Sequence, residues 1–101
     1  MKKYSINQTE TFVHWKNALK DLKAKAAILR RIDRAEQGNL GDIKPVGSAV
    51  SEMRIDVGAG YRLYFTIRNG EILILLAGGD KSTQQKDIEK AIKLAKDTNH
   101  E

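Results

Sequence analysis

The order of apolar and polar residues predicts a short strand and two helices in the first third of the chain. Residues 3–7 suit a strand, and Thr9 followed by Glu10 suits the start of a helix. Apolar residues then recur at steps of three and four on one helical face, formed by Phe12, Trp15, Leu19 and Leu22. The short connection that follows predicts that the next helix folds back as an antiparallel hairpin.

The second predicted helix spans residues 24–37 and ends at Gly38 and Asn39. Its apolar residues, which we expect to face the core, are Ala24, Ala27, Ile28, Ile32 and Ala35. Its basic residues, which we expect to face largely outward, are Lys25, Arg30, Arg31 and Arg34. The helix is therefore amphipathic and has a cationic outer surface.

From about residue 44 the hydrophobic period changes from about 3.6 residues to 2, which predicts an antiparallel sheet. Pro45 suits an edge strand. Residues 51–57 alternate between apolar and charged side chains, and the glycines at 58–60 predict a turn. The next strand, over residues 61–68, alternates in the same way.

The Asn69-Gly70 pair is typical of a tight hairpin, and residues 71–77 are apolar on both faces, as in a central strand. Ser82 or Thr83 is then expected to cap a last helix. Its narrow apolar stripe consists of Ile88, Ala91, Ile92 and Ala95. The expected fold class is α+β, with an N-terminal helical hairpin packed on an antiparallel sheet of about four strands and a C-terminal helix. We expect residues 1–101 to form a single domain.

Composition narrows the class of protein. The chain has 101 residues, no cysteine and no apolar run near the ~20 residues of a membrane span. These features exclude a disulfide framework and a cysteine-ligated zinc site, and we expect a cytoplasmic protein without a membrane partner. The net charge is +5, with 13 lysines and arginines against 7 acidic residues in residues 1–68. Such a surface attracts a polyanion or an acidic protein, although a merely solvated helix face is the alternative.

Strand alternation places four side chains of two neighbouring strands on one sheet face: Arg54, Arg62, Tyr64 and Arg68. Because Leu63, Phe65 and Ile67 must bury against the helical hairpin, the basic face is expected to be open or only partly covered. Such a face can hold RNA, with arginines on phosphates and Tyr64 or Tyr61 stacked on a base. An ordinary solvated face, with Arg54 paired to an acidic neighbour, is the alternative.

Cleavage of RNA needs cations beside the phosphate, a base for the ribose 2′-hydroxyl and an acid for the leaving oxygen. The available cations are Arg54, Arg62, Lys44 and Lys81. For proton transfer the sequence leaves Glu52, Asp80 and a lysine open. His14 is expected on a helix surface, and its large sequence separation from His100 argues against a metal site, so we expect no metal and no cofactor.

The segment Gly78-Gly79-Asp80-Lys81-Ser82 can be interpreted as an anion-binding turn ahead of a helix. It can equally be a glycine-rich turn that only lets the chain leave the central strand.

Several motifs together resemble one known family. They are Arg31-Ile32-Asp33-Arg34, Gly38-Asn39-Leu40-Gly41-Asp42-Ile43-Lys44-Pro45-Val46-Gly47, Ser51-Glu52-Met53-Arg54-Ile55, Gly60-Tyr61-Arg62-Leu63-Tyr64-Phe65 and Gly78-Gly79-Asp80-Lys81-Ser82-Thr83-Gln84. This set resembles the addiction-module killer group of the RelE/ParE superfamily, close to the HigB-type toxins. The resemblance runs from Phe12 to about Ala95.

The resemblance implies a stable toxin of a type II toxin–antitoxin system, neutralised by a labile antitoxin. That antitoxin is often a helix-turn-helix protein that represses the operon, so operator DNA is contacted only through it. The commonest action in this group is ribosome-dependent cleavage of messenger RNA, which inhibits translation and growth. The resemblance implies catalytic roles for Arg62, which matches the arginine on the scissile phosphate, and for Arg54 and Lys81. Lys44 is added to this catalytic set as a further available cation. The residues expected to contact RNA are Arg68, Tyr64, Tyr61, Arg30 and Arg34.

The chain also departs from the ribosome-dependent nucleases that it resembles. RelE itself, among them, has two lysines at alternate positions before the Gly-Tyr-Arg turn, where this chain has Arg54 and Asp56. RelE also has a tyrosine shortly after the central strand, where this chain has Gln84 and Gln85. Two other functions therefore stay open beside the endoribonuclease: a non-enzymatic inhibitor of DNA gyrase, as in the ParE branch, and a degenerate module that only binds its antitoxin as a co-repressor.

Overall fold

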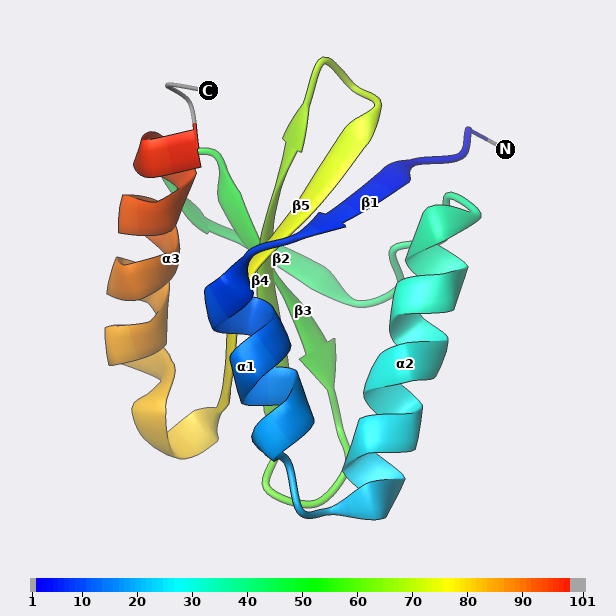
Figure 1. Cartoon of the computed structure of the whole chain (residues 1–101), viewed down its shortest axis with the longest axis vertical. Helices are drawn as coiled ribbons and strands as arrows, with labels where there is room; N and C mark the ends of the chain where they lie inside the picture. Colours follow the sequence, from blue (N-terminus) through cyan, green and yellow to red (C-terminus); the bar gives the residue numbers. More distant parts are fainter. Residues whose placement is uncertain (1, 99–101) are drawn as a thin grey trace.

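The computed structural model describes residues 2–98 and contains a five-stranded sheet with helices on both faces (Figure 1). The elements in chain order are β1 (Ser5–Gln8), α1 (Glu10–Ala18), α2 (Leu22–Glu36), β2 (Ile43–Gly47), β3 (Val50–Ile55), β4 (Tyr61–Arg68), β5 (Ile72–Asp80), a short 3-10 helix (Lys81–Thr83) and α3 (Gln84–Thr98). The strand order is β1-β5-β4-β3-β2, in which β1 runs parallel to β5 and all other neighbours are antiparallel. The expected α+β class is confirmed.

Side-chain caps determine where the first two helices begin. The hydroxyl of Thr9 accepts a hydrogen bond of 3.0 Å from the Phe12 amide, as the sequence predicts. Asp21 caps α2 in the same way, with 3.1 Å between Oδ1 and the Ala24 amide. Leu22 therefore begins α2, where it is 78% exposed. The sequence pattern predicted that Leu22 lies on the buried stripe of the first helix. That prediction is wrong, because the Asp21 cap begins a second helix at this point.

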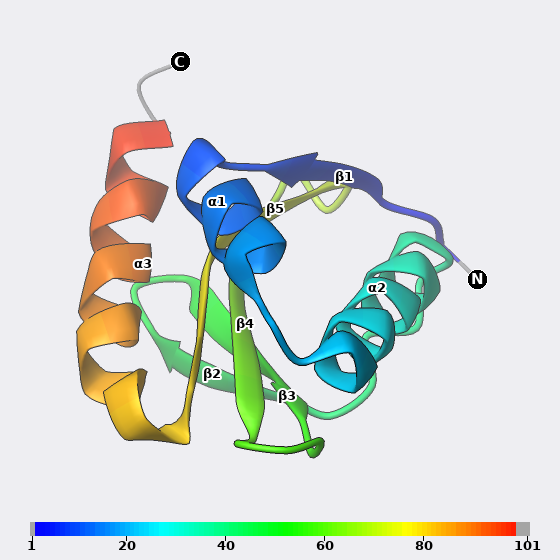
Figure 2. The same ribbon diagram turned by 60° about the horizontal axis from the view of Figure 1, so that its bottom comes forward.

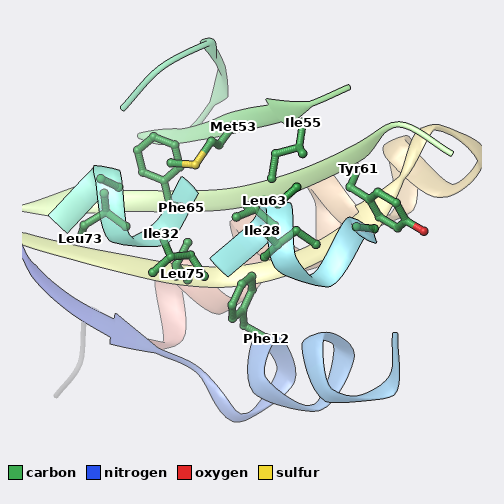
Figure 3. Close-up of a cluster of buried hydrophobic side chains, with 13 residues drawn as sticks. Phe12, Ile28, Ile32, Met53, Ile55, Tyr61, Leu63, Phe65, Leu73 and Leu75 are labelled. Atoms are coloured by element: carbon green, nitrogen blue, oxygen red, sulfur yellow. The ribbon is translucent and has the colours of Figure 1, made fainter. Parts of the chain in front are cut away.

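The sheet separates two hydrophobic cores, because alternate residues of β4 point to opposite faces. Leu63 and Phe65 are buried under α1 and α2, and Figure 3 shows them with Phe12, Ile28 and Ile32 of these helices. All five apolar residues predicted to face inward from α2 are buried. Burying one large apolar side chain contributes about 1.5–3 kcal/mol, so this cluster is the main source of stability on that face.

The second core lies on the opposite face of the sheet, under α3. Tyr64 is completely buried there, and Ala91 and Ala95 of α3 pack against the same cluster. Figure 2 shows α3 along one side of the sheet and α1 with α2 on the other. Of the two expectations for the Tyr64 face, open or only partly covered, the first is therefore wrong, because the C-terminal helix covers Tyr64 there.

Glycines allow close packing where β5 ends. Gly78 and Gly79 are buried within β5, so they do not form the anion-binding turn that the sequence suggested. A Cβ atom on Gly78 would overlap the indole of Trp15, and one on Gly79 would overlap the carboxylate of Asp87. The chain leaves the strand at Asp80, whose carboxylate accepts a 2.8 Å hydrogen bond from the Ser82 amide. Asp80 is therefore the N-cap of the 3-10 helix that leads into α3.

The remaining turn and strand predictions agree with the structure. Asn69 and Gly70, with φ of 54° and 64°, form the tight turn between β4 and β5. Pro45 lies in β2, which is an edge strand, and β5 lies between β1 and β4. Within residues 2–98, no helix has both the length and the apolar character that crossing a membrane requires.

Candidate functional site

Two rows of side chains cross the sheet face toward α3. In one row, Arg54 of β3 is the direct partner of Arg62 of β4. In the next, Lys44 of β2 is the partner of Glu52, which is in turn the partner of Tyr64. Alternation along the strands puts both rows on the same face. This face therefore brings three of the four predicted catalytic cations together with a carboxylate and a phenol.

Lys81, the fourth cation, approaches Arg62 from the 3-10 helix. Its side chain lies over Gly60, since a Cβ atom on Gly60 would be 2.7 Å from Cε of Lys81. Nη1 of Arg62 donates a hydrogen bond of 3.1 Å to the main-chain oxygen of the same glycine. Both side chains therefore lie against Gly60, in the turn that precedes β4. We call Arg54, Arg62, Lys44 and Lys81 the cation cluster.

Arg54 is held by an acidic neighbour and by the chain around it. Its Nη2 donates to Oδ1 of Asp42 at 2.9 Å, which raises the pKa of Arg54 and lowers the pKa of Asp42. Arg31 of α2 donates to the main-chain oxygens of Arg54 and Leu40, at 2.6 and 2.9 Å. Arg31 thus ties α2 to the loop that carries Asp42, a role that helical periodicity, which placed it outward, did not reveal.

A buried polar group lies beneath the first turn of α3. Glu52 is 2% exposed and accepts a 3.0 Å hydrogen bond from Nε2 of Gln84. Burial raises the pKa of Tyr64, and the nearby Glu52 and Asp87 carboxylates add to this effect, so the phenol stays protonated. Oη of Tyr64 and Nε of Arg62 are buried without a hydrogen-bond partner among residues 2–98. The first turn of α3 thus covers polar atoms that have no hydrogen-bond partner within the described residues.

The two tyrosines proposed to stack on RNA are both covered. Tyr64 is fully buried under α3, and Tyr61 is 8% exposed on the opposite face of the sheet. The ring of Tyr61 lies 6.3 Å from that of Trp15, measured between centroids. Neither ring is exposed for stacking on a base in this arrangement.

The other three residues expected to contact RNA lie away from the cation cluster. Arg68 donates to the main-chain oxygens of Thr98 and Ala95, at 2.5 and 2.9 Å, and so holds the C-terminal end of α3. Arg30 and Arg34 are exposed on α2, on the other side of the sheet. Arg68 therefore caps a helix, whereas Arg30 and Arg34 belong to a basic surface on α2 that is distant from the cation cluster.

Metal ligation was not expected, and residues 2–98 contain no group of three histidine, cysteine, aspartate or glutamate residues placed to share an ion. His14 is exposed on α1. His100 lies outside the described residues.

Comparison with known proteins shows the family. Residues 17–99 match the family described as Phage derived protein Gp49-like (DUF891). A protein of Haemophilus influenzae, described as uncharacterized, is 53% identical over 92 residues, which cover 91% of this chain and 93% of the relative. The chain belongs to the Gp49-like family.

The fold is that of the RelE toxin. The E. coli toxin RelE, solved in the free state as a mutant with two arginines changed to alanine, matches with a TM-score of 0.70. The match covers 90% of this chain and 96% of RelE, at 14% sequence identity. The RelE-like fold that the sequence resemblance implied is confirmed.

Proposed function

We propose that this chain is the toxin of a type II toxin–antitoxin system and cleaves messenger RNA on the ribosome. The observation that carries the proposal is the cation cluster, in which Arg54 and Arg62 are direct cross-strand partners and both Arg62 and Lys81 lie against Gly60. Fixed cations of this kind stabilise the charge that develops on a phosphate in the transition state. The Gly-Tyr-Arg motif, the Gp49-like family and the RelE fold support the toxin assignment.

In the proposed reaction the ribose 2′-oxygen attacks the adjacent phosphorus and the 5′-oxygen leaves with a proton taken from solvent, so that a 2′,3′-cyclic phosphate and a 5′-hydroxyl remain. Arg62 and Arg54 stabilise the negative charge on the non-bridging oxygens, and Lys44 and Lys81 assist. Loss of one fixed donor of this kind typically lowers a rate by about 10²–10³.

Glu52 is the better of the two carboxylates for accepting the 2′-hydroxyl proton. Asp80 already accepts hydrogen bonds from the Ser82 hydroxyl and amide, and these bonds lower its pKa. A carboxylate whose pKa is lowered is a weaker base. Glu52 accepts one hydrogen bond, from Gln84, and lies next to the Arg54 row. We therefore assign the proton acceptor to Glu52.

Access to this site depends on α3. Glu52 and Arg62 are only 2% and 8% exposed, and Gln84 begins the helix that covers them. In the proposed mechanism the first turn of α3 moves away from β3 when RNA binds. Gln84 then exchanges its hydrogen bond to Glu52 for one to solvent or RNA.

The proposed partners follow from this function. They are a cognate antitoxin of the helix-turn-helix type, the ribosome and messenger RNA, with operator DNA reached only through the antitoxin. The proposed place of action is the cytoplasm, where translation occurs. The basic surface on the outer side of α2 suits both ribosomal RNA and an acidic segment of an antitoxin.

The burial of Glu52, Arg62 and Tyr64 favours a second candidate, a ParE-like inhibitor of DNA gyrase, because such a protein binds its target and needs no open catalytic face. A catalytically degenerate co-repressor that only binds its antitoxin is the third candidate.

The test is controlled expression of the wild type, Arg62→Ala and Lys93→Ala, with growth curves and genome-wide mapping of messenger RNA 5′ ends. Lys93 is exposed on α3, so Lys93→Ala is a control variant that also removes one positive charge. The nuclease proposal expects new 5′ ends inside translated frames for the wild type and Lys93→Ala, and none for Arg62→Ala. Growth arrest with intact messenger RNA would contradict it, and a plasmid supercoiling assay would then test gyrase. No growth arrest would favour the co-repressor.

A further inference from the structure

The outer face of α2 carries apolar side chains that no other part of residues 2–98 covers. Leu22 and Leu29 are 78% and 44% exposed, and Ala26 between them is also exposed. The steps of four and three residues place the three on one helical stripe. In the described chain the exposed large hydrophobic residues are Leu22, Leu29 and Ile43, so two of the three belong to this stripe. Figures 1 and 2 show α2 at the side of the molecule.

The core does not need these side chains, because α2 already contributes a complete inner face. That face consists of Ala24, Ala27, Ile28, Ile32 and Ala35, all buried. Packing within the chain therefore explains the inner stripe of the helix and leaves the outer one unexplained. An apolar stripe that remains in contact with water is typical of a surface that another molecule covers.

A row of cations runs beside the stripe. At about 100° per residue, Lys23, Arg30 and Arg34 lie together on one flank of Leu22, Ala26 and Leu29. All three cations are exposed, and none forms an ion pair within the part of the chain that the structure describes. We call these six residues the α2 surface: Leu22, Lys23, Ala26, Leu29, Arg30 and Arg34. It combines an apolar stripe with positive charge on one side, and the exposed Asp33 continues the stripe one turn beyond Leu29.

This combination selects among possible occupants. RNA would use the cations but would leave Leu22 and Leu29 in water, because phosphate neutralisation requires no apolar contact. A second copy of this chain would bring its own cationic row to the surface, and like charges across an interface are unfavourable. An amphipathic helix with acidic residues beside its apolar residues matches both features.

We propose that the α2 surface docks an acidic amphipathic helix of a partner protein. Under the proposed function, on which this part of the inference rests, the partner is the antitoxin. Arg54 and Arg62 lie on the opposite face of the sheet from α2. The partner is therefore held without occupying the cation cluster, and Arg62→Ala leaves its affinity unchanged.

The experiment measures binding of the purified protein encoded by the reading frame next to this gene, by titration calorimetry at two salt concentrations. The variants are Leu22→Ser/Leu29→Ser and Lys23→Glu/Arg30→Glu/Arg34→Glu, with Lys86→Glu/Lys90→Glu/Lys93→Glu on exposed positions of α3 as the charge-matched control. Each α2 variant is expected to weaken binding by about tenfold or more, as for loss of central interface contacts. The control should stay within about threefold of the wild type. Thermal melts confirm that each variant is folded.

Unchanged affinity of both α2 variants would overturn the proposal, and so would an equal loss in the α3 control, which would show an effect of net charge alone. If the charge reversals weaken binding to purified ribosomes while the serine variant has no effect on either ligand, the surface binds RNA. A wild-type dimer in sedimentation that Leu22→Ser/Leu29→Ser dissociates would mean that a second copy covers the stripe. Either result overturns the proposal.

The experiments distinguish failure of the α2 docking proposal from failure of the proposed function. If the neighbouring protein does not bind the wild type, both the antitoxin assignment and the α2 proposal are overturned. Mapping of messenger RNA 5′ ends tests cleavage independently, and Leu22→Ser/Leu29→Ser should retain it because the cation cluster and the basic residues of α2 are intact.

Discussion

Arg54 and Arg62 are direct cross-strand partners, so two guanidinium-bearing side chains lie next to each other on one face of the sheet. Like charges in this position destabilise a sheet. Asp42 offsets the charge of Arg54 through an ion pair of 2.9 Å, whereas Arg62 has no carboxylate within ion-pair distance in residues 2–98. A phosphate bound at this pair would supply the missing negative charge, as the proposed function requires.

The first prediction concerns Glu52. Glu52→Gln should lower messenger RNA cleavage on purified translating ribosomes by about 10²–10⁴, because the amide cannot accept the 2′-hydroxyl proton. Its melting temperature should stay close to that of the wild type, since the amide oxygen can still accept the hydrogen bond from Gln84. Asp80→Asn is the control, because asparagine is also a good cap, and it should retain most activity. Full activity of Glu52→Gln would remove Glu52 from the mechanism.

A second prediction concerns the end of α3. Arg68→Gln should reduce the free energy of unfolding by about 1–3 kcal/mol, because it removes charged hydrogen bonds to the main-chain oxygens of Ala95 and Thr98. Arg30→Gln changes an exposed arginine on α2 and should stay within about 0.5 kcal/mol of the wild type. Urea unfolding measures both. Similar values for the two variants would show that Arg68 does not hold the helix.

The paired glycines of β5 allow a third test. Gly78→Ala and Gly79→Ala should each cost about 1–3 kcal/mol, because each new methyl group overlaps a packed side chain. Only Gly78→Ala should change the emission of Trp15, the single tryptophan of the chain, since the Gly79 methyl would meet Asp87 instead. Urea unfolding followed by fluorescence measures both effects. An emission shift in Gly79→Ala alone would contradict the described packing.

The fourth prediction is a dependence of stability on alkaline pH. Burial raises the pKa of Tyr64 in the folded chain above the value of about 10 that it has when unfolded. The stability that comes from this difference is present below about pH 10 and is lost as pH rises toward the folded pKa. The free energy of unfolding should therefore decline above about pH 10 more steeply for the wild type than for Tyr64→Phe. Equal slopes would contradict the assignment.

At neutral pH the same substitution should have little effect. Tyr64→Phe should change the free energy of unfolding by less than about 1 kcal/mol, because the lost hydroxyl has no hydrogen-bond partner in residues 2–98. A much larger loss would indicate that the hydroxyl is bonded in solution.

Local pattern was sufficient for most of the fold and for the pairing of the main cations. The inward residues of α2, the turn at Asn69 and Gly70 and the shared face of Arg54 and Arg62 all follow from helical or strand periodicity, which depends on sequence spacing alone. The motifs around Arg62 and Gly78 were enough to predict a RelE-like fold, which the structure has. Each of these features is a property of neighbouring residues.

Only the tertiary structure shows what covers the sheet face that Arg54 and Arg62 share, and which side chains on that face remain exposed. Periodicity shows that α3 has an apolar stripe, but it does not show which sheet face receives it, so the burial of Tyr64 and Glu52 could not be predicted. For the same reason Arg68 was expected on RNA, although it caps α3, and Arg31 was expected in solvent, although it holds Arg54. Contacts between residues distant in sequence depend on how the helices dock, and no local spacing encodes that choice.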